Sequence, residues 1–378
     1  MAFDLSFGEL SVEQFLKEYW QQKPLVIRQG LENFSSPITA DELAGLACEE
    51  QVHSRIVIEK GGDKPWQLIE GPMDEAIFAS LPETHWTLLV NDVEKHFPEL
   101  IDVVDAFRFI PEWRIDDLMI SFAPEGGTVG PHLDQYDVFI LQAQGHRRWQ
   151  INTQASDDSN QLDGVDLKIQ KNFLAEQEWL LAPGDIIYIP PGVSHYGVAT
   201  DDCLSFSIGY RAPTHAEMLE SFIAHITSHL PLDSVYKDNN LIPQNASNEI
   251  TNSAIENVRE IFKEYLNPNH PALADWFGRF VTESKTDLDF EIETPLQSYQ
   301  SLLENYPVIK RNPASRFAYQ EKDNKTVLFV DGERLEVKHD FAKTVCETRY
   351  LNLETANFNH QEQEVILNFF NRGILIFS

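Results

Sequence analysis

The sequence has few cysteines, few basic residues and no long apolar run. Its three cysteines, Cys48, Cys203 and Cys346, form no CxxC pair and cannot make a disulfide framework. We therefore expect a reducing compartment and a cytoplasmic location. No run approaches the roughly 18–20 apolar residues of a membrane span, and the acidic start MAFDLSFGEL lacks the apolar region of a signal peptide. We expect no membrane partner.

Basic residues are outnumbered two to one. The chain has 29 Lys and Arg against 60 Asp and Glu, a net charge of −31. Residues 1–210 hold 13 basic and 35 acidic residues, a net of −22, and the remainder carries −9. This charge disfavours nucleic acid and anionic lipid as partners and favours a basic one. A need for solubility would explain the negative charge as well as a basic partner would.

The hydrophobic content is sufficient for a core. Hydrophobic residues make up 42% of the 378 residues and aromatic residues 11%, and at about 150 residues per domain two or three domains are expected. A helix is predicted over 11–21 and another over 98–107. Short β-rich runs separated by Gly, Pro and Asp turns predict an antiparallel sandwich or barrel. The runs are 24–28, 55–59, 66–70, 85–90, 114–123, 136–144, 147–153, 178–182, 185–190 and 203–210.

The pattern changes after Pro213. Helical periodicity predominates from 214 to about 294, interrupted by a polar stretch at 233–250 that we interpret as a loop. The last part mixes helices with a hairpin at 326–337, whose Asp331-Gly332 pair is a strong turn signal. Residues 295–378 contain 10 basic and 11 acidic residues. Without a basic face, nucleic-acid binding by this part is not expected.

One constellation indicates metal chemistry. In VGPHLDQYDVF, His132 and Asp134 are two residues apart in a segment leading into a strand, so their side chains share a face. An HxD pair alone is common by chance, but PGDIIYIPPGVSHYG supplies a further histidine, His195, just after a strand. Two histidines and one carboxylate form the facial triad of non-haem Fe(II) oxygenases. We therefore predict that these three residues are metal ligands and form the catalytic centre.

A 2-oxo acid bound to such a metal needs a cation for its distal carboxylate. Strand parity separates the two candidates, because Arg147 shares a face with Trp149 and Ile151, whereas Arg148 shares one with Gln150. The apolar face should point inward, so Arg147 is the predicted anchor. Ser121 on the preceding strand could add a hydroxyl group. An inward arginine could instead form a structural ion pair.

A second histidine cluster is the main competitor. His225 and His229 have the i, i+4 spacing that can bind a metal on a helix, with His215 upstream. No HExxH glutamate accompanies them, and the segment is amphipathic. We interpret these residues as polar helix surface.

These motifs resemble those of the JmjC-type 2-oxoglutarate oxygenases, and within them the bacterial ribosomal oxygenases. The resemblance is carried by SVEQFLKEYWQQKPLVIR, by LMISFAPEGGTVGPHLDQYDVFILQAQGHRRWQI and by PGDIIYIPPGVSHYGVA. It matches His132, Asp134 and His195 to the iron ligands. It also matches Arg147 and Ser121 to the groups that bind 2-oxoglutarate.

The resemblance implies an α+β protein with a defined organisation. A JmjC-type double-stranded β-helix, the cupin or jelly-roll barrel, is expected over 1–213 with its core at about 90–213. A helical dimerisation region is expected over 214–294, and a small winged-helix domain over 295–378. The family implies a homodimer that uses Fe(II), 2-oxoglutarate and O2. The implied reaction is hydroxylation of an arginine β-carbon in large-subunit ribosomal protein sixteen, a basic partner.

Three alternatives stay open on the residues themselves. A protein-lysine demethylase or hydroxylase of the same superfamily would use the same triad. A metal-binding cupin without catalysis would not depend on 2-oxoglutarate and would leave Arg147 unexplained. A transcription regulator built on the C-terminal part is disfavoured by its charge.

Overall fold

The computed structural model describes residues 3–60, 65–154, 160–162, 167–284, 295–322 and 325–377. The chain divides into two compact units, Met1–Ala212 and Pro213–Ser378. Within the described residues, no helix is long and apolar enough to cross a membrane.

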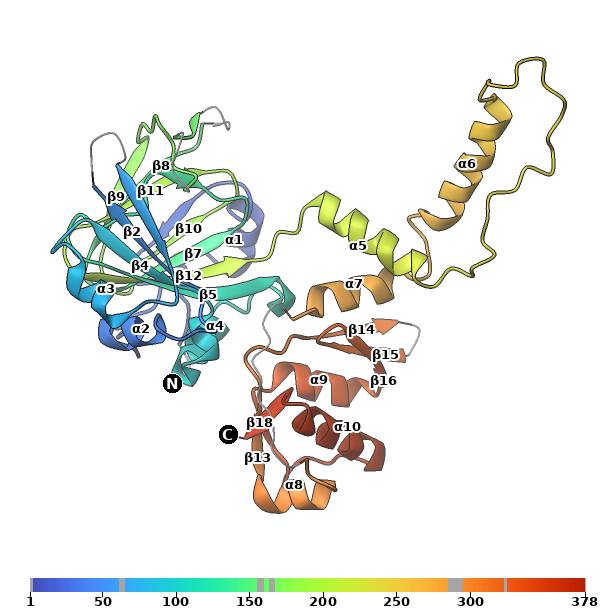
Figure 1. Ribbon diagram of the computed structural model, residues 1–378. Helices are drawn as coiled ribbons and strands as arrows, with labels where there is room; N and C mark the ends of the chain where they lie inside the picture. Colours follow the sequence, from blue (N-terminus) through green and yellow to red (C-terminus); the bar gives the residue numbers. More distant parts are fainter. Residues whose placement is uncertain are drawn as a thin grey trace. The chain divides into compact units, whose positions relative to one another are not determined.

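The first unit consists mainly of β-strands (Figure 1), and the part that the structure describes has twelve of them. Its helices are short and lie mostly in the first half of the unit. The strands are β1 Leu25–Ile27, β2 Ser54–Glu59, β3 Trp66–Glu70, β4 Trp86–Val90, β5 Ile115–Ala123, β6 His132–Leu133, β7 Val138–Gln144, β8 Arg147–Asn152, β9 Gln177–Leu181, β10 Ile186–Ile189, β11 Ser194–Ala199 and β12 Cys203–Tyr210. The helices are α1 Val12–Glu18, α2 Ala40–Leu46, α3 Glu75–Ser80, η1 Val93–Lys95, η2 Pro98–Leu100, α4 Ile101–Asp105 and η3 Glu112–Arg114.

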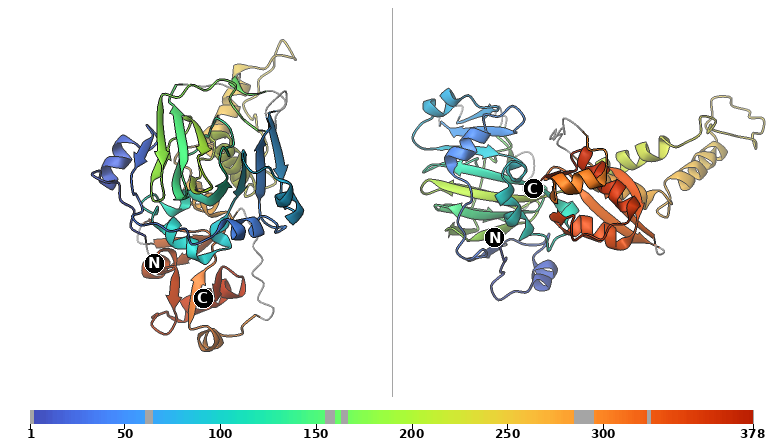
Figure 2. Two further views of the ribbon diagram at one scale, coloured as in Figure 1. Left: turned by 90° about the vertical axis from the view of Figure 1, so that its left-hand side faces the viewer. Right: turned by 90° about the horizontal axis from the view of Figure 1, so that it is seen from below.

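These strands form two antiparallel sheets. The larger has the order β1-β10-β7-β12-β5-β4-β2-β3, and the smaller β6-β11-β8-β9. Side chains of β7 and β10 share a hydrophobic cluster with side chains of β8 and β9, so the sheets pack face to face (Figure 2). This arrangement is the predicted double-stranded β-helix barrel, and the α+β fold class is confirmed.

Local sequence signals explain where several elements begin. Ser11 caps α1 through a capping box with Gln14, which sets the start of the helix at Val12. The helix predicted over 11–21 is shorter at its C-terminal end, where it stops at Glu18. The helix predicted over 98–107 is a 3₁₀ turn, η2, followed by the five-residue helix α4. Strands β1 to β4 extend the large sheet, with β1 paired to β10 and β4 paired to β5.

The second unit begins with helices and continues as a mixed helix and sheet structure. Its helices are α5 His215–Thr227, α6 Asn252–Tyr265, α7 Leu273–Thr282, α8 Tyr299–Asn305, α9 His339–Glu347 and α10 His360–Asn371. Its strands are β13 Val308–Arg311, β14 Phe317–Lys322, β15 Lys325–Val330, β16 Glu333–Val337, β17 Tyr350–Asn352 and β18 Leu375–Phe377. The predicted hairpin is β15–β16, and its turn residues Asp331 and Gly332 both have positive φ. The expected domain boundary at 294/295 adjoins residues 285–294, which lie outside the described residues.

Candidate functional site

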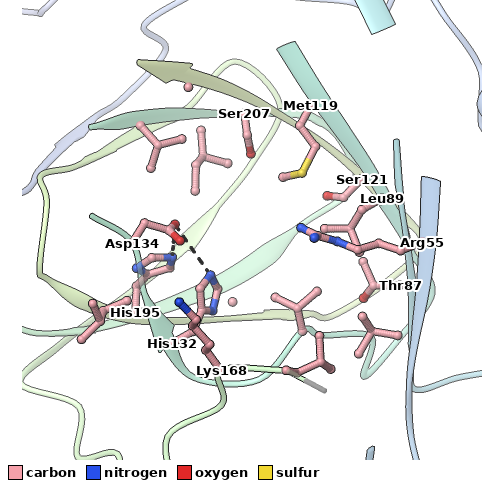
Figure 3. A pocket seen from close by; sticks show the side chains of 18 of the residues that line it. Arg55, Thr87, Leu89, Met119, Ser121, His132, Asp134, Lys168, His195 and Ser207 are labelled. Atoms are coloured by element: carbon pink, nitrogen blue, oxygen red, sulfur yellow. Dashed lines mark ion pairs between the residues drawn. The ribbon is translucent and has the colours of Figure 1, made fainter. Parts of the chain in front are cut away.

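His132 and His195 lie side by side on neighbouring strands. Strand β6 pairs with β11 so that the two histidines are direct partners, with ring centroids 4.2 Å apart. Asp134 follows β6, and its Oδ2 lies 3.8 Å from Nε2 of His132 and 3.6 Å from Nε2 of His195 (Figure 3). The structure therefore brings together the three residues that the HxD spacing and the downstream histidine single out.

Backbone carbonyls set the orientation of both imidazole rings. Nδ1 of His132 lies 2.9 Å from the Gly130 carbonyl oxygen, and Nδ1 of His195 lies 3.0 Å from that of Val193. A carbonyl only accepts, so each Nδ1 carries a proton and donates it, which leaves each Nε2 as the ring nitrogen nearer to Asp134.

The protonation state of His195 suits metal binding. Burial, aided by the neighbouring His132, lowers the pKa of His195 to about 4, so it is neutral near pH 7. Two imidazole nitrogens and one carboxylate oxygen are ligands that a divalent transition metal accepts. Among the described residues, this is the one group of three side chains placed to hold a metal ion.

Arg147 is buried without a counter-charge. It is 4% exposed on β8, and its Nη1 donates a hydrogen bond to Ser121 Oγ over 3.2 Å. Its Nε has no hydrogen-bond partner, and no described carboxylate forms an ion pair with the guanidinium. Burial lowers the pKa of Arg147, although an arginine stays charged in a protein.

Arg148 has the opposite orientation, in agreement with the strand parity. Its side chain is 53% exposed and pairs with Glu178 on the outer face of the sheet. The structural ion pair considered for an inward arginine is not formed by Arg147 within the described residues. The inward guanidinium is therefore available to an anion.

A cavity of about 360 Å³ between the sheets joins the histidine cluster to Arg147. Figure 3 shows Ser121 and Thr87 across this cavity from His132, Asp134 and His195. Besides Arg147 Nε, two further buried polar atoms of the lining lack a hydrogen-bond partner, Thr87 Oγ1 and Trp149 Nε1. Buried polar groups are normally paired, so three orphans in one cavity indicate a polar ligand.

The same cavity also contains an acidic group. Asp117 on β5 lines it together with Tyr136 and Ser207. Burial raises the pKa of Asp117, and also that of Tyr136, where the Asp134 carboxylate adds to the effect. No described lysine or arginine lies within ion-pair distance of the Asp117 carboxylate. This side of the cavity can therefore accept a cationic side chain.

Thr87, Asp117 and Tyr136 are not singled out by the sequence. Thr87 and Asp117 occur in ordinary β-strand segments, and only the pairing of β2, β4 and β5 turns them toward the cavity. Tyr136 lies two residues after Asp134, so the alternation of side chains along a strand predicts that both lie on the same face. Tyr136 could therefore have been predicted as a site residue from its spacing.

One histidine of the competing pair, His225, lies close to a carboxylate on a neighbouring helix. Nε2 of His225 on α5 lies 3.9 Å from Oδ2 of Asp275 on α7. The Asp275 carboxylate also binds Arg279 and Arg334, each at 3.0 Å. His225 is therefore partly buried against α7, whereas His229 is on the exposed surface as expected.

Two family models match the chain. The model of the JmjC domain matches residues 102–218, which include the histidine cluster and Arg147. The model of the ROXA-like winged helix matches residues 267–373, so that match begins before the boundary expected at 295.

Relatives cover most of the chain. The chain is 39% identical to the "Ribosomal protein uL16 3-hydroxylase" of Escherichia coli (strain K12) over 292 residues, which are 77% of this chain and 76% of that protein. It is 41% identical to the "Probable ribosomal oxygenase" of Haemophilus influenzae over 56% of this chain and 52% of that protein.

Solved structures agree with this relationship. The X-ray structure of E. coli ycfD covers 100% of both chains with a TM-score of 0.88 and 32% identity. A structure of YcfD, described as a ribosomal oxygenase from Escherichia coli in complex with cobalt and 2-oxoglutarate, covers 100% of this chain and 99% of that one, with a TM-score of 0.85 and 33% identity. The chain therefore belongs to the family of JmjC-domain ribosomal oxygenases.

Proposed function

We propose that this protein is a 2-oxoglutarate- and Fe(II)-dependent dioxygenase that hydroxylates an arginine side chain, at the β-carbon, in ribosomal protein uL16 of the large subunit. The observation that carries the proposal is a single cavity with three features. Its lining includes a two-histidine, one-carboxylate cluster, a buried arginine and a carboxylate, and neither of the last two has an ion-pair partner among the described residues. The relative named uL16 3-hydroxylase supports the reaction and the substrate.

The residues present fit the metal and the co-substrate. His132, Asp134 and His195 would hold the metal through two imidazole nitrogens and one carboxylate oxygen. Bound Fe(II) with 2-oxoglutarate and O2 supplies the oxidation that converts a C–H bond to C–OH, with succinate and carbon dioxide as coproducts. Arg147 and Ser121 would bind the distal carboxylate of 2-oxoglutarate. Thr87 and Trp149 offer the cavity's other unused hydrogen-bonding atoms.

The acidic side of the cavity favours a cationic substrate such as arginine. Asp117 can bind a guanidinium through charge-assisted hydrogen bonds, and the Tyr136 ring lies within the same lining. The charge of −22 over residues 1–210 would attract a basic ribosomal protein and repel nucleic acid and anionic membranes. A lysine-directed activity would use the same triad, so the substrate decides between these two members of the superfamily.

The test is an intact-mass measurement on recombinant uL16. After aerobic incubation with this protein, Fe(II) and 2-oxoglutarate, we expect a gain of one oxygen atom that fragmentation assigns to an arginine. The mixture without 2-oxoglutarate should show no gain. Succinate formation without modification of uL16 would retain the oxygenase and reject the substrate, whereas the absence of both would favour a binding protein.

We also propose that the helical region after Pro213 forms a homodimer. Helix α6 exposes Ile255, Val258 and Phe262 along one face, and α5 exposes Leu219 and Ile223. Figures 1 and 2 show α6 and the preceding loop extending away from α5 and α7, so the described part of the second unit does not cover this apolar face. A second copy of the chain would bury this apolar face. We also propose the division of the chain into three parts, 1–213, 214–294 and 295–378.

Phe262→Glu should convert the dimer to a monomer. Phe262 is 59% exposed on α6, and a carboxylate in an apolar interface would weaken association by about 100-fold or more. Light scattering after size exclusion should give a mass near 43.3 kDa for the variant and twice that value for the wild type. Lys263→Glu is the matched control, because Lys263 lies on the polar face next to Glu260. A wild-type mass near 43.3 kDa would contradict the dimer, and a Phe262→Glu variant that stays at twice this mass would contradict the α6 interface.

A further inference from the structure

The Asp117 carboxylate is held from one side by an amide. Asn91, directly after β4, donates from Nδ2 to Asp117 Oδ2 over 2.9 Å, and both residues line the cavity. This bond uses one oxygen of the carboxylate and fixes the plane of the group. No hydrogen bond from a described residue to Oδ1 is seen, and Asp117 lines the cavity.

The turn that follows Asn91 is also hydrogen-bonded to β5, at Leu118, the residue after Asp117. Glu94 in η1 accepts a hydrogen bond from the backbone N–H of Leu118 over 3.0 Å. The turn is closed by an ion pair between Lys95 and Asp92, whose atoms lie 2.5 Å apart. Asn91 and Asp117 are therefore connected through the backbone as well as through their side chains, which limits the movement of the carboxylate.

A glycine leaves space beside the free oxygen. Gly209 on β12 lines the same cavity, and a Cβ added to it would lie 3.2 Å from Asp117 Oδ1. Its φ is not in the left-handed region, so the backbone itself does not require glycine at this position. What the missing side chain provides is room next to the carboxylate.

We propose that Asn91 and Gly209 are specificity-determining residues that shape a guanidinium subsite around Asp117. Asn91 acts as a positioning residue that presents the carboxylate in a fixed plane, and Gly209 provides the room in which a planar guanidinium pairs with it. A guanidinium forms two parallel hydrogen bonds in the plane of a carboxylate, so a fixed plane favours it, whereas an ammonium group is a point charge that gains less from a fixed plane. The two residues would thus favour arginine over lysine. The inference rests on the proposed function and names the residues that give it selectivity.

The test measures binding of two substrates to six proteins. Wild type, Asn91→Ala, Gly209→Ala, Asp117→Asn and the Asn91→Ala/Asp117→Asn double variant are loaded with Mn(II) and 2-oxoglutarate. Calorimetry then gives the Kd for uL16 and for uL16 in which the modified arginine is replaced by lysine. Gly45→Ala is the matched glycine control, because its added Cβ meets nothing within 4 Å.

We expect Asn91→Ala and Gly209→Ala to weaken binding of the arginine form by about fivefold or more, and that of the lysine form by less than twofold. The effect of Asn91→Ala should vanish in the Asp117→Asn background, because it acts through that carboxylate. A merely structural role would weaken both forms equally and would persist in the double variant, so either result overturns the inference. Wild-type affinity in both single variants overturns it as well. Failure of the proposed function is distinguishable, since wild-type protein would then leave uL16 unmodified in the mass measurement.

Discussion

Asp134→Ala is expected to remove Fe(II) binding and to reduce hydroxylation of uL16 by more than about 1,000-fold. Its carboxylate is the one anionic member of the cluster and lies within 3.8 Å of both Nε2 atoms. The remaining pair of neutral imidazoles would hold the ion weakly, and the coordination geometry on which catalysis depends would be lost. Succinate release and metal content after dialysis measure the two losses separately.

A matched control separates this effect from the loss of a surface charge. Asp202→Ala removes an exposed carboxylate from the turn before β12 and should leave both metal content and turnover unchanged. The thermal unfolding midpoint of Asp134→Ala should stay close to that of the metal-free wild type, because Asp134 is partly exposed and contributes little to the core. Retained succinate formation by Asp134→Ala would remove this residue from the predicted ligands.

Much of the barrel could be predicted from the sequence, because period-two patterns and turn residues are local signals. The strands over 114–210 and the Asp331-Gly332 hairpin are such cases. Pairing is not local, and nothing in residues 24–28 indicates that β1 joins β10 about 160 positions later. The helix predicted over 98–107 shows the limit of periodicity, since its apolar residues pack in a 3₁₀ turn and one short helix.

The same distinction applies to the site. His132, Asp134 and His195 stand out because metal ligands have restricted residue types and spacings. Arg147 could be chosen over Arg148 because successive side chains of a strand point to opposite faces, so the residues next to each arginine in the sequence show which face it shares. Asn91, Asp117 and Gly209 give no such signal, because their importance arises from the register of β4, β5 and β12.

Arg147→Met should have effects of opposite sign on function and on stability. The KM for 2-oxoglutarate is expected to rise by about 100-fold or more, because the variant cannot pair with the distal carboxylate in a buried site. Without ligand, however, the wild type carries a guanidinium that is 4% exposed and has no described counter-charge. Methionine fills similar space without the cost of a buried charge. We therefore expect the free energy of unfolding of the ligand-free variant to rise by about 1–3 kcal/mol, less about 1 kcal/mol for the hydrogen bond lost by Ser121.

Urea unfolding with and without 2-oxoglutarate measures both effects. With Mn(II) bound, 2-oxoglutarate at 100 times its Kd should stabilise the wild type by about 2.7 kcal/mol and leave Arg147→Met almost unchanged. Arg147→Lys is the conservative control, since it keeps the charge but loses the fork-shaped donor, so its KM should lie between the other two. A destabilised Arg147→Met variant with an ordinary KM would show that the guanidinium is a structural group. Gain of stability with loss of co-substrate binding would instead show that the fold tolerates an unpaired charge in its core because 2-oxoglutarate completes the pair.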